Sequence, residues 1–319
     1  MQRLMHRNCL ESAEQRIPRL ARALWRTCLG LFRVVAIVGI SYVALFPLLS
    51  KISSSLMAYE DLYDQSVLWV PRHFTLSYYE AAFERMNYPE AALRSFLLAS
   101  VVAALQLASC SVVAYGFARY RAPGSNLLFG LVIFTLIVPP QMIMIPQYIN
   151  FRYFNPFGLL PGGGINLIGT YWPAICVSMT AMGLRNGLFI YILRQYFRGM
   201  PKDLEDAAYV DGAGPFRAFC TVILPGAVPA LVIVFLFAFV WQWNDYYFTT
   251  TFMSGRELLP NRLIGLPAAF GLDHNAYGTP YYSTILNTGS VLFILPLLVL
   301  YAFMQRHFVE SIERTGIVG

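Results

Sequence analysis

Residues 201–214 read Pro-Lys-Asp-Leu-Glu-Asp-Ala-Ala-Tyr-Val-Asp-Gly-Ala-Gly, and an Ile-Leu-Pro sequence follows at 223–225. This is the most polar and most densely charged run after the N-terminal arm. It lies between two apolar runs, 171–193 and 227–247, each of about 20 residues, which is the length that crosses the hydrocarbon core of a bilayer. A polar helical segment in that position indicates a docking surface outside the membrane.

The start of this run has the features of a helix N-terminus. Pro201 fits the first helical position, where its missing N–H is not needed. Asp203, Glu205 and Asp206 then place negative charge in the first turn, which the helix dipole favours. The sequence therefore predicts a short helix that begins at Pro201.

The rest of the run predicts how this helix meets a partner and how it ends. Ala207 and Ala208 have little bulk, so another protein can approach them closely. Gly212 ends or bends the helix, and Pro225 starts or kinks the next one. The residues alone leave two interpretations open: a helix-glycine-helix docking unit, and an ordinary solvated loop.

The composition is that of a membrane protein. The chain is 57% hydrophobic and 13% charged, whereas soluble domains carry about 25% charged residues. Its mean hydropathy is +0.54. Lipid offers no hydrogen-bond partners to the backbone, so only helices or closed barrels can span it, and these apolar runs are too long for barrel strands. We expect an all-α polytopic membrane protein.

The apolar runs predict six transmembrane helices and a simple division of the chain. Residues 1–30 form a basic cytoplasmic arm, for which a helix lying on the membrane surface and a flexible segment are both open. Residues 31–304 form the transmembrane domain, with the polar loop at 194–226, and 305–319 form a tail. The predicted spans are 31–50, 95–117, 127–149 (interrupted by Pro139, Pro140 and Pro146), 171–193, 227–247 and 283–304.

Basic residues predict the orientation. With six spans both termini lie on the same side. The arm with Arg33, the turn at 118–125, the loop at 194–219 and the tail hold 15 of the 23 lysines and arginines, and the opposite loops hold seven. Since cytoplasmic loops carry the excess of Lys and Arg, we expect both termini and the 194–219 loop to be cytoplasmic.

The polar loop resembles the signature loop of binding-protein-dependent ABC importer permeases. That pattern runs Glu-Ala-Ala, three residues, Gly, and then Ile-x-Leu-Pro. Here Asp206-Ala207-Ala208 takes the Glu-Ala-Ala position, Gly212 is the glycine, and Val-Ile-Leu-Pro at 222–225 closes the pattern. The departure is Asp206, which is one methylene shorter than Glu, and Glu205 beside it is a candidate to share its role.

The resemblance extends over nearly the whole chain from about residue 31. The sequences at 194–197, 209–213, 243–245 and 305–309 are similar to the carbohydrate branch of these permeases, and to its maltose-type second subunit. It implies the type I ABC importer permease fold in a bacterial plasma membrane. It also implies that the loop is a coupling helix, with contact residues Glu205, Asp206, Ala207, Ala208, Asp211, Gly212, Ala213, Leu224 and Pro225.

The partners implied by this resemblance are a homologous second permease, a cytoplasmic ATPase dimer and an extracytoplasmic solute-binding protein that delivers a sugar or oligosaccharide. The chain itself is expected to be a transport subunit and not an enzyme. Its two lysines, Lys51 and Lys202, follow no Gly-x-x-x-x-Gly-Lys-Ser/Thr loop. ATP and Mg²⁺ are therefore expected in the ATPase. Neither the five cysteines nor the four histidines show a metal-site spacing.

Two groups of residues are candidates for the solute pathway. Arg185 and Asn186 lie inside the fourth span, where an ionisable residue indicates a pathway or a buried partner. An arginine facing the cavity would favour an acidic sugar, because its guanidinium binds carboxylates with two hydrogen bonds. Structural pairing and snorkelling remain open for it. Trp243, Asn244 and Asp245 end the fifth span, where Trp serves either as a stacking surface for sugars or as an interfacial anchor.

Other functions stay open at this level. The same machine could carry glycerol phosphate, a polyol or a peptide. A membrane-embedded transferase would need paired carboxylates or a metal at the surface, and the acidic residues at 203–211 are the only candidates. A secondary carrier is the third alternative, although the internal repeat that such carriers often have is not visible.

Overall fold

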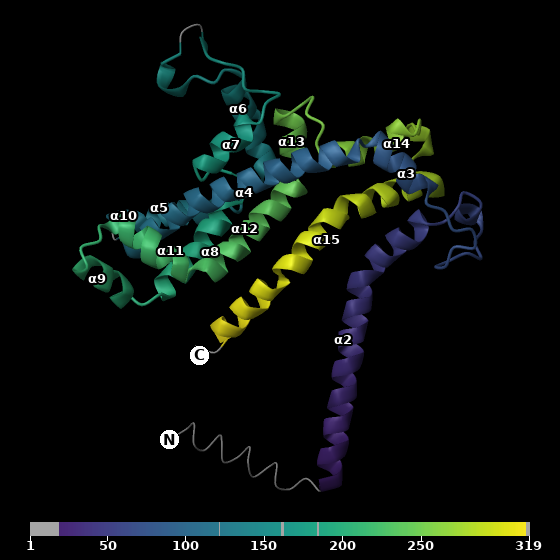
Figure 1. Cartoon of the computed structure of the whole chain (residues 1–319), viewed down its shortest axis with the longest axis horizontal. Helices are drawn as coiled ribbons and strands as arrows, with labels where there is room; N and C mark the ends of the chain where they lie inside the picture. Colours follow the sequence, from purple (N-terminus) through teal and green to yellow (C-terminus); the bar gives the residue numbers. More distant parts are fainter. Residues whose placement is uncertain (1–18, 121, 161–162, 184, 317–319) are drawn as a thin grey trace. The chain divides into compact units, whose positions relative to one another are not determined.

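The computed structural model describes residues 19–120, 122–160, 163–183 and 185–316 (Figure 1). Almost all of the regular structure is helical, and the β-type pairing found in these ranges is limited to two isolated bridges. Contacts divide the chain into two compact units, residues 1–75 and 76–319. Residues 1–18 and 317–319, which belong to the predicted arm and tail, lie outside the described ranges.

The first unit contains α2 (Arg19–Ser55), followed by a loop with the short helix η1 (Asp61–Tyr63). With 37 residues, α2 is about 55 Å long at 1.5 Å per residue, which exceeds the roughly 30 Å of hydrocarbon. Its apolar part, Trp25–Ser55, is long and apolar enough to cross a membrane and contains the predicted span 31–50. Residues 19–30, predicted as part of a separate arm, are the first turns of this helix.

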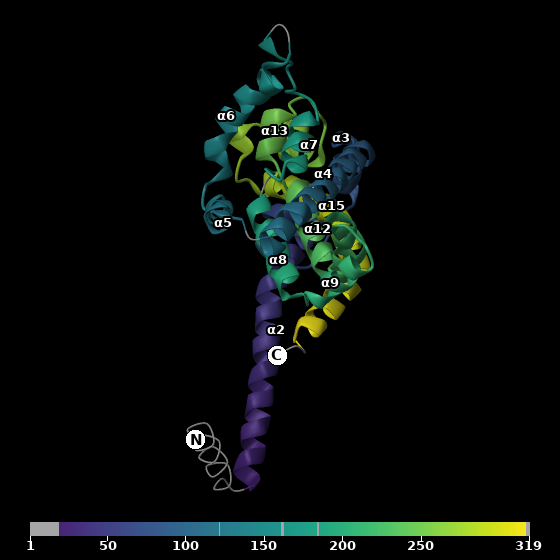
Figure 2. The ribbon, with the colours of Figure 1, turned by 90° about the vertical axis from the view of Figure 1, so that its left-hand side faces the viewer.

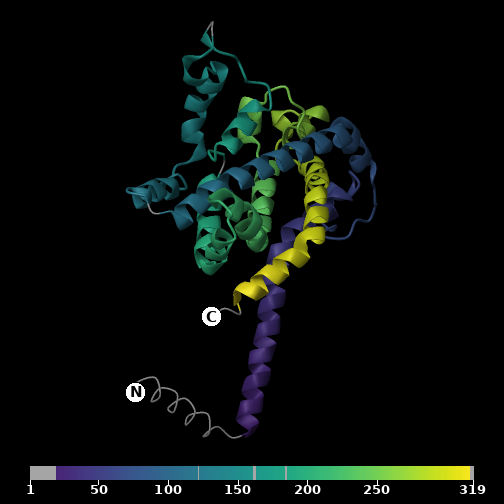
Figure 3. The same cartoon turned by 60° about the vertical axis from the view of Figure 1, so that its left-hand side comes forward.

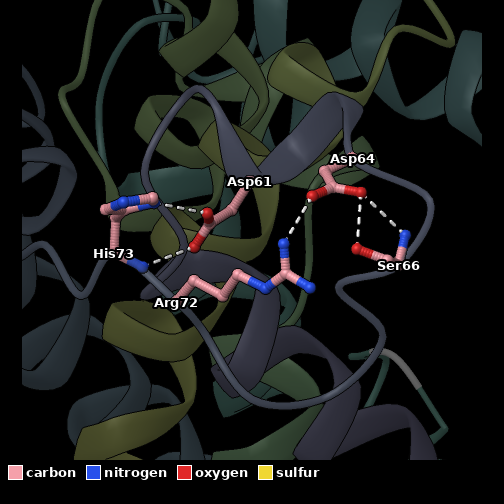
Figure 4. Close-up of polar contacts among 5 residues, drawn as sticks. All are labelled: Asp61, Asp64, Ser66, Arg72 and His73. Carbon is pink, nitrogen blue, oxygen red and sulfur yellow. Dashed lines mark hydrogen bonds and ion pairs between the residues drawn. The ribbon is translucent and has the colours of Figure 1, made fainter.

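The loop that follows α2 is held by two carboxylates (Figure 4). Asp61 is buried and accepts hydrogen bonds from the backbone N–H of His73 at 2.8 Å, and pairs with its Nδ1, also at 2.8 Å. Asp64 accepts from Ser66 and from Arg72 Nη1 at 3.0 Å. Hydrogen bonds from His73 hold the pKa of Asp61 below its usual value, and the Asp61 carboxylate raises the pKa of His73.

The second unit is a helical bundle arranged around α4 (Figures 1 and 2). Helices α8 and α12 pack along α4. The buried face of α4 is lined mainly by small residues such as Ala99, Ala103 and Ala114, which allow close approach of neighbouring backbones. The helices of this unit are α3 (Ser77–Arg85), α4 (Tyr88–Arg119), α5 (Ser125–Phe134), α6 (Pro140–Arg152), η2 (Pro156–Gly158), α7 (Trp172–Met179), α8 (Asn186–Gly199), α9 (Asp203–Val210), α10 (Pro215–Ala218), the π-helical η4 (Phe219–Ile223), α11 (Leu224–Gly226), α12 (Val228–Trp243), α13 (Tyr247–Phe252), α14 (Leu259–Ala269), η5 (His274–Ala276) and α15 (Pro280–Gly316).

The predicted spans differ in how they are built. Among the described residues, three helices are long and apolar enough to cross a membrane, within α2, α4 and α15, and the bent pair Pro215–Gly226 and Val228–Trp243, with an angle of 82°, passes the same test only when its two parts are taken together. The third and fourth predicted spans are each divided into two shorter helices. A single continuous helix for each of the six spans is therefore not what the structure contains.

The two divided spans have identifiable local causes. The third span breaks between α5 and α6, where Pro139 has an extended backbone and Pro140 begins α6. The fourth breaks between α7 and α8, where Ala181 and Arg185 both have positive φ, 57° and 60°. Left-handed backbone at residues with side chains is strained, and such strain often accompanies functional sites.

The carboxylate contacts predict a pH window for the loop at 61–73. The stabilisation from Asp61 is present above its unfolded pKa of 3.8 and is lost as the pH falls through its lowered value. The stabilisation from His73 is present below 6.5 and is lost as the pH rises through its raised value. Hydrogen exchange of the His73 amide, corrected for its intrinsic rate, should be slowest between about pH 4 and 6.5.

The control for this prediction is His73→Gln, which keeps a polar side chain but does not titrate near neutral pH. Its amide protection should stay constant from pH 5.5 to 8.5. An identical loss of protection above neutral pH in the wild type and in His73→Gln would contradict the assignment.

Candidate functional site

The polar loop begins with a short helix, α9, whose first residue is Asp203. The carbonyl of Lys202 accepts the N–H groups of Glu205 at 2.8 Å and Asp206 at 3.0 Å, so Lys202 is the N-cap. The prediction that Pro201 takes the first helical position is therefore wrong by two residues. The acidic residues do lie in the first turn, where the helix dipole favours them.

The end of α9 depends on Gly212. The N–H of Gly212 donates to the carbonyl of Tyr209 at 3.0 Å, and the N–H of Ala213 donates to that of Ala208 at 2.9 Å. This pair of bonds is a Schellman motif, which requires a left-handed residue after the helix. Gly212 has φ +81°, and a Cβ placed on it meets nothing within 4 Å. A glycine is therefore needed here because of the left-handed backbone, and not because a neighbouring atom of this chain would clash with a side chain.

The two faces of α9 differ. Glu205 and Ala208 are buried against the protein, whereas Asp206, Ala207 and Asp211 are exposed. The expectation that Ala208 belongs to the open surface is wrong, because the helix turns this residue inward beside Glu205. The outward face is therefore acidic, with the small side chain of Ala207 beside Asp206.

Glu205 forms a buried ion pair with the end of α4. Its Oε1 accepts from Arg119 Nε at 2.7 Å, and the side chains of Arg119 and Glu205 are only 6% and 8% exposed. Arg119 Nη2 also donates to the carbonyl of Met200 at 3.0 Å. Glu205 is therefore committed to its own chain, and of these two neighbouring acidic residues only Asp206 is presented outward. In the sequence, Arg119 was only one of the basic residues that predict the orientation of the chain, and its pairing with Glu205 was not predicted.

The chain after Gly212 returns to the bundle through a strongly bent segment. Pro215 begins α10, and the π-helical turn η4 and α11 lead to α12. Leu224 and Ala213 are half-buried, whereas Pro225 is exposed. Val210 is 88% exposed and Phe216 is 74% exposed. These two residues add an apolar component to the acidic outward face. The segment Pro215–Gly226 and the helix α12 meet at an angle of 82°.

The candidate pathway residues separate into different environments. Arg185 is exposed, and its guanidinium carbon lies 4.9 Å from the centre of the Trp241 ring. The ion pairs among the described residues do not include Arg185. Asn186, the first residue of α8, is buried. The sequence did not single out Trp241, over whose ring the guanidinium of Arg185 lies.

The group at the end of α12 has structural partners. Trp243 is 1% exposed, and its indole N–H donates to the carbonyl of Phe293 at 3.3 Å. Asp245 accepts the N–H groups of Phe248 and Thr249, which caps α13. The amide of Asn244 donates to Val240. Contact between Trp243 and a solute would require the core around it to open.

Residues 110–314 match the family described as "Binding-protein-dependent transport system inner membrane component". The chain belongs to this family. It is a multi-pass membrane permease, a transport component that works with an ATPase and a solute-binding protein. Within the described residues, no group of three or more His, Cys, Asp or Glu side chains could hold a metal ion.

Several relatives are similar over most of the chain. The osmoprotective compounds uptake permease protein GgtD of Synechocystis is 32% identical, covering 87% of this chain and 89% of its own. The arabinooligosaccharides transport system permease protein AraQ of Halalkalibacterium halodurans is 28% identical, covering 88% and 93%. A crystal structure of a bacterial ABC transporter involved in the import of alginate matches with a TM-score of 0.70 at 20% identity, covering 92% of this chain and 99% of that one, so it shows the fold alone.

The buried pair predicts a specific pattern of stability. Arg119→Met or Glu205→Met alone leaves one buried charge without its partner, and each should cost about 3 kcal/mol of unfolding free energy. The double variant removes both charges and should recover most of that loss. Reversible unfolding in mixed detergent micelles measures all three, and additive losses in the double variant would contradict a direct pair.

Proposed function

We propose that this permease is one of two homologous transmembrane subunits of an ATP-driven importer that brings a sugar or oligosaccharide into a bacterial cytoplasm. The named relatives support the solute class. Besides the arabinooligosaccharide permease, they include the alpha-glucoside transport system permease protein AglG of Rhizobium meliloti, which is 29% identical over 78% of this chain. They also include the polygalacturonan/rhamnogalacturonan permease YtcP of Bacillus subtilis, which is 24% identical over 84% of this chain.

The observation that carries the proposal is the exposed face of the docking loop, which we define as residues 194–226. This face combines Asp206 and Asp211 with the apolar side chains of Val210 and Phe216. The same loop also exposes the basic residues Arg198, Lys202 and Arg217, so the cleft that fits it has an apolar floor and a rim with charges of both signs. We assign that cleft to the ATPase. The residues that contact it are then the exposed members of the predicted coupling set, such as Asp206, Ala207 and Asp211.

Figures 1 and 3 support the proposed sidedness within the second unit. The helices α9, α10 and α11 lie near one end of α4 and α12, and α13, α14 and α3 lie near the other. The basic residues favour the cytoplasm for the docking loop and for both termini. In this arrangement α5 with α6, and α7 with α8, complete six crossings, two of them broken. The other end of α4 then faces the solute-binding protein.

Assembly and uptake test the proposal together. The chain should purify with one homologous permease and two ATPase copies. The complex, reconstituted in proteoliposomes with its solute-binding protein, should take up at least one of maltotriose, arabinotriose and trigalacturonate. Sorbitol tests the polyol alternative. ATP hydrolysis or solute uptake by the purified chain alone would contradict the proposal.

Gly212 allows the docking step to be separated from folding. Gly212→Asn and Gly212→Trp both carry a side chain at φ +81°, and Asn tolerates that conformation better. Because the space around Gly212 is open within this chain, the bulk of Trp should matter mainly in the assembled transporter. We expect Gly212→Asn to keep most of the uptake and Gly212→Trp to abolish it while membrane insertion persists. Normal uptake in Gly212→Trp would contradict docking here.

We further propose that Arg185 favours an acidic solute. Its guanidinium rests on Trp241 and is exposed, so its N–H groups are available to a carboxylate. Arg185→Lys keeps the charge but loses the planar fork. It should slow uptake of trigalacturonate about tenfold and leave uptake of maltotriose nearly unchanged. Equal effects on both trisaccharides, or loss of the assembled complex in Arg185→Lys and Arg185→Ala, would make the residue structural.

A further inference from the structure

The break between α7 and α8 lies beside uncharged polar side chains from several helices. Gln106 of α4 and Asn186 of α8 are 4% and 2% exposed. Ser178 of α7 is also buried, and Gln242 comes from α12. Polar groups inside the membrane are costly unless they have partners, so their bonding shows what they do.

Asn186 has no partner for its side chain. Both its Oδ1 and its Nδ2 are buried without a hydrogen bond among the residues that the structure describes. Its main chain, by contrast, is bonded: the N–H of Asn186 donates to the carbonyl of Gly183 at 3.2 Å. A buried amide without bonds is destabilising, and each such group in a native structure needs an explanation.

Gln106 faces the same space. A Cβ placed on Gly183 would overlap Gln106 Nε2 and would lie 3.3 Å from Asn186 Nδ2. The amide of Gln106 therefore lies in the place that a side chain on Gly183 would take, close to the amide of Asn186. Gly183 is not among the residues with positive φ, so its glycine serves this close approach and not a left-handed backbone.

A small cavity adjoins the group. It is lined by Gln106, Ser178 and Gln242 together with Ala174, Val177 and Phe248, and its volume is about 10 Å³. That is close to the space that one water molecule occupies. Three residues of the break that neighbours this group in sequence, Thr180, Met182 and Arg185, are exposed.

Interhelical bonding does not account for these amides. Polar residues that hold membrane helices together do so by hydrogen bonds between them. Here Ser178 Oγ donates to the carbonyl of Ala174 in its own helix at 2.6 Å. Two contacts across helices, from Ser109 Oγ to the carbonyl of Ser178 at 2.7 Å and from Cys110 Sγ to the carbonyl of Asn186 at 3.9 Å, use neither side-chain amide. The bonding groups of Asn186 remain available to a ligand.

We propose that Asn186 and Gln106 form a hydroxyl-binding subsite for the transported solute. This inference rests on the proposed function and extends it to a position in the pathway. A carboxamide offers one acceptor oxygen and two N–H donors, which match the hydroxyl groups of a sugar. Water has the same donor and acceptor chemistry and occupies the subsite when solute is absent.

The decisive variant is Asn186→Leu, which has the same number and branching of side-chain heavy atoms and no polar group. Uptake of the trisaccharide that the wild-type complex transports should show a KM raised about fivefold to tenfold, the share of one neutral hydrogen bond. The thermal midpoint of the assembled complex should stay the same or rise, because an unpaired buried amide is removed. Gly183→Ala, which fills the space from the opposite side, should raise KM as well.

The matched control is Ser111→Ala. Ser111 is a buried polar residue of the same helix as Gln106, but its Oγ donates to Leu107 of that helix at 2.6 Å. Its replacement should leave KM unchanged.

Two results would overturn the subsite. A thermal midpoint that falls in Asn186→Leu, with uptake lost only in proportion to assembled complex, would mean that the amide is structural. Unchanged KM in both Asn186→Leu and Gly183→Ala would mean that the space holds water only. If the wild-type complex takes up none of the solutes tested, the proposed function is contradicted instead, and the thermal comparison alone then decides whether the amide is structural.

Discussion

The buried ion pair between Arg119 and Glu205 is the contact on which the arrangement of the docking loop depends. Two charges taken out of water are stable only when each has good partners, and Arg119 satisfies both Glu205 and the carbonyl of Met200. The pair thereby fixes the rotation of α9 about its own axis. With Glu205 and Ala208 turned inward, Asp206, Ala207 and Val210 must face outward. One internal contact therefore decides which side chains of α9 are presented at the surface.

The two broken spans follow from the need to satisfy backbone groups in a medium without water. At the α7–α8 break the N–H of Met182 donates to Val177 at 2.9 Å, and Ser109 donates to the carbonyl of Ser178. Irregular backbone at membrane depth is tolerated where the protein supplies such partners or where it lines a cavity. Several backbone groups of this break therefore have hydrogen-bond partners. The side-chain amide of Asn186, by contrast, has none among the described residues.

The sequence predicted those features that depend on neighbouring residues along the chain, such as apolar runs and helix ends. The long apolar runs located α2, α4 and α15, and Gly212 marked the end of α9 because left-handed backbone favours glycine. The family signature located the docking loop, but the inward orientation of Glu205 depends on Arg119, which is 86 positions away along the chain. Likewise, Pro139 and Pro140 signalled the break in the third span, whereas the left-handed Ala181 and Arg185 carry no such signal. The pairing of Arg185 with Trp241 also depends on tertiary contact.

The length of α4 has a mechanical consequence. Its 32 residues make a rod of about 48 Å, with Arg119 paired with Glu205 of α9 at one end. Near the other end, Ser95 Oγ accepts the N–H of Leu259, the first residue of α14. A tilt of about 5° at the Arg119 end would move the far end by about 4 Å, which is comparable with the element shifts that switch proteins between states. One continuous helix thus joins the Arg119–Glu205 ion pair to the hydrogen bond between Ser95 and Leu259.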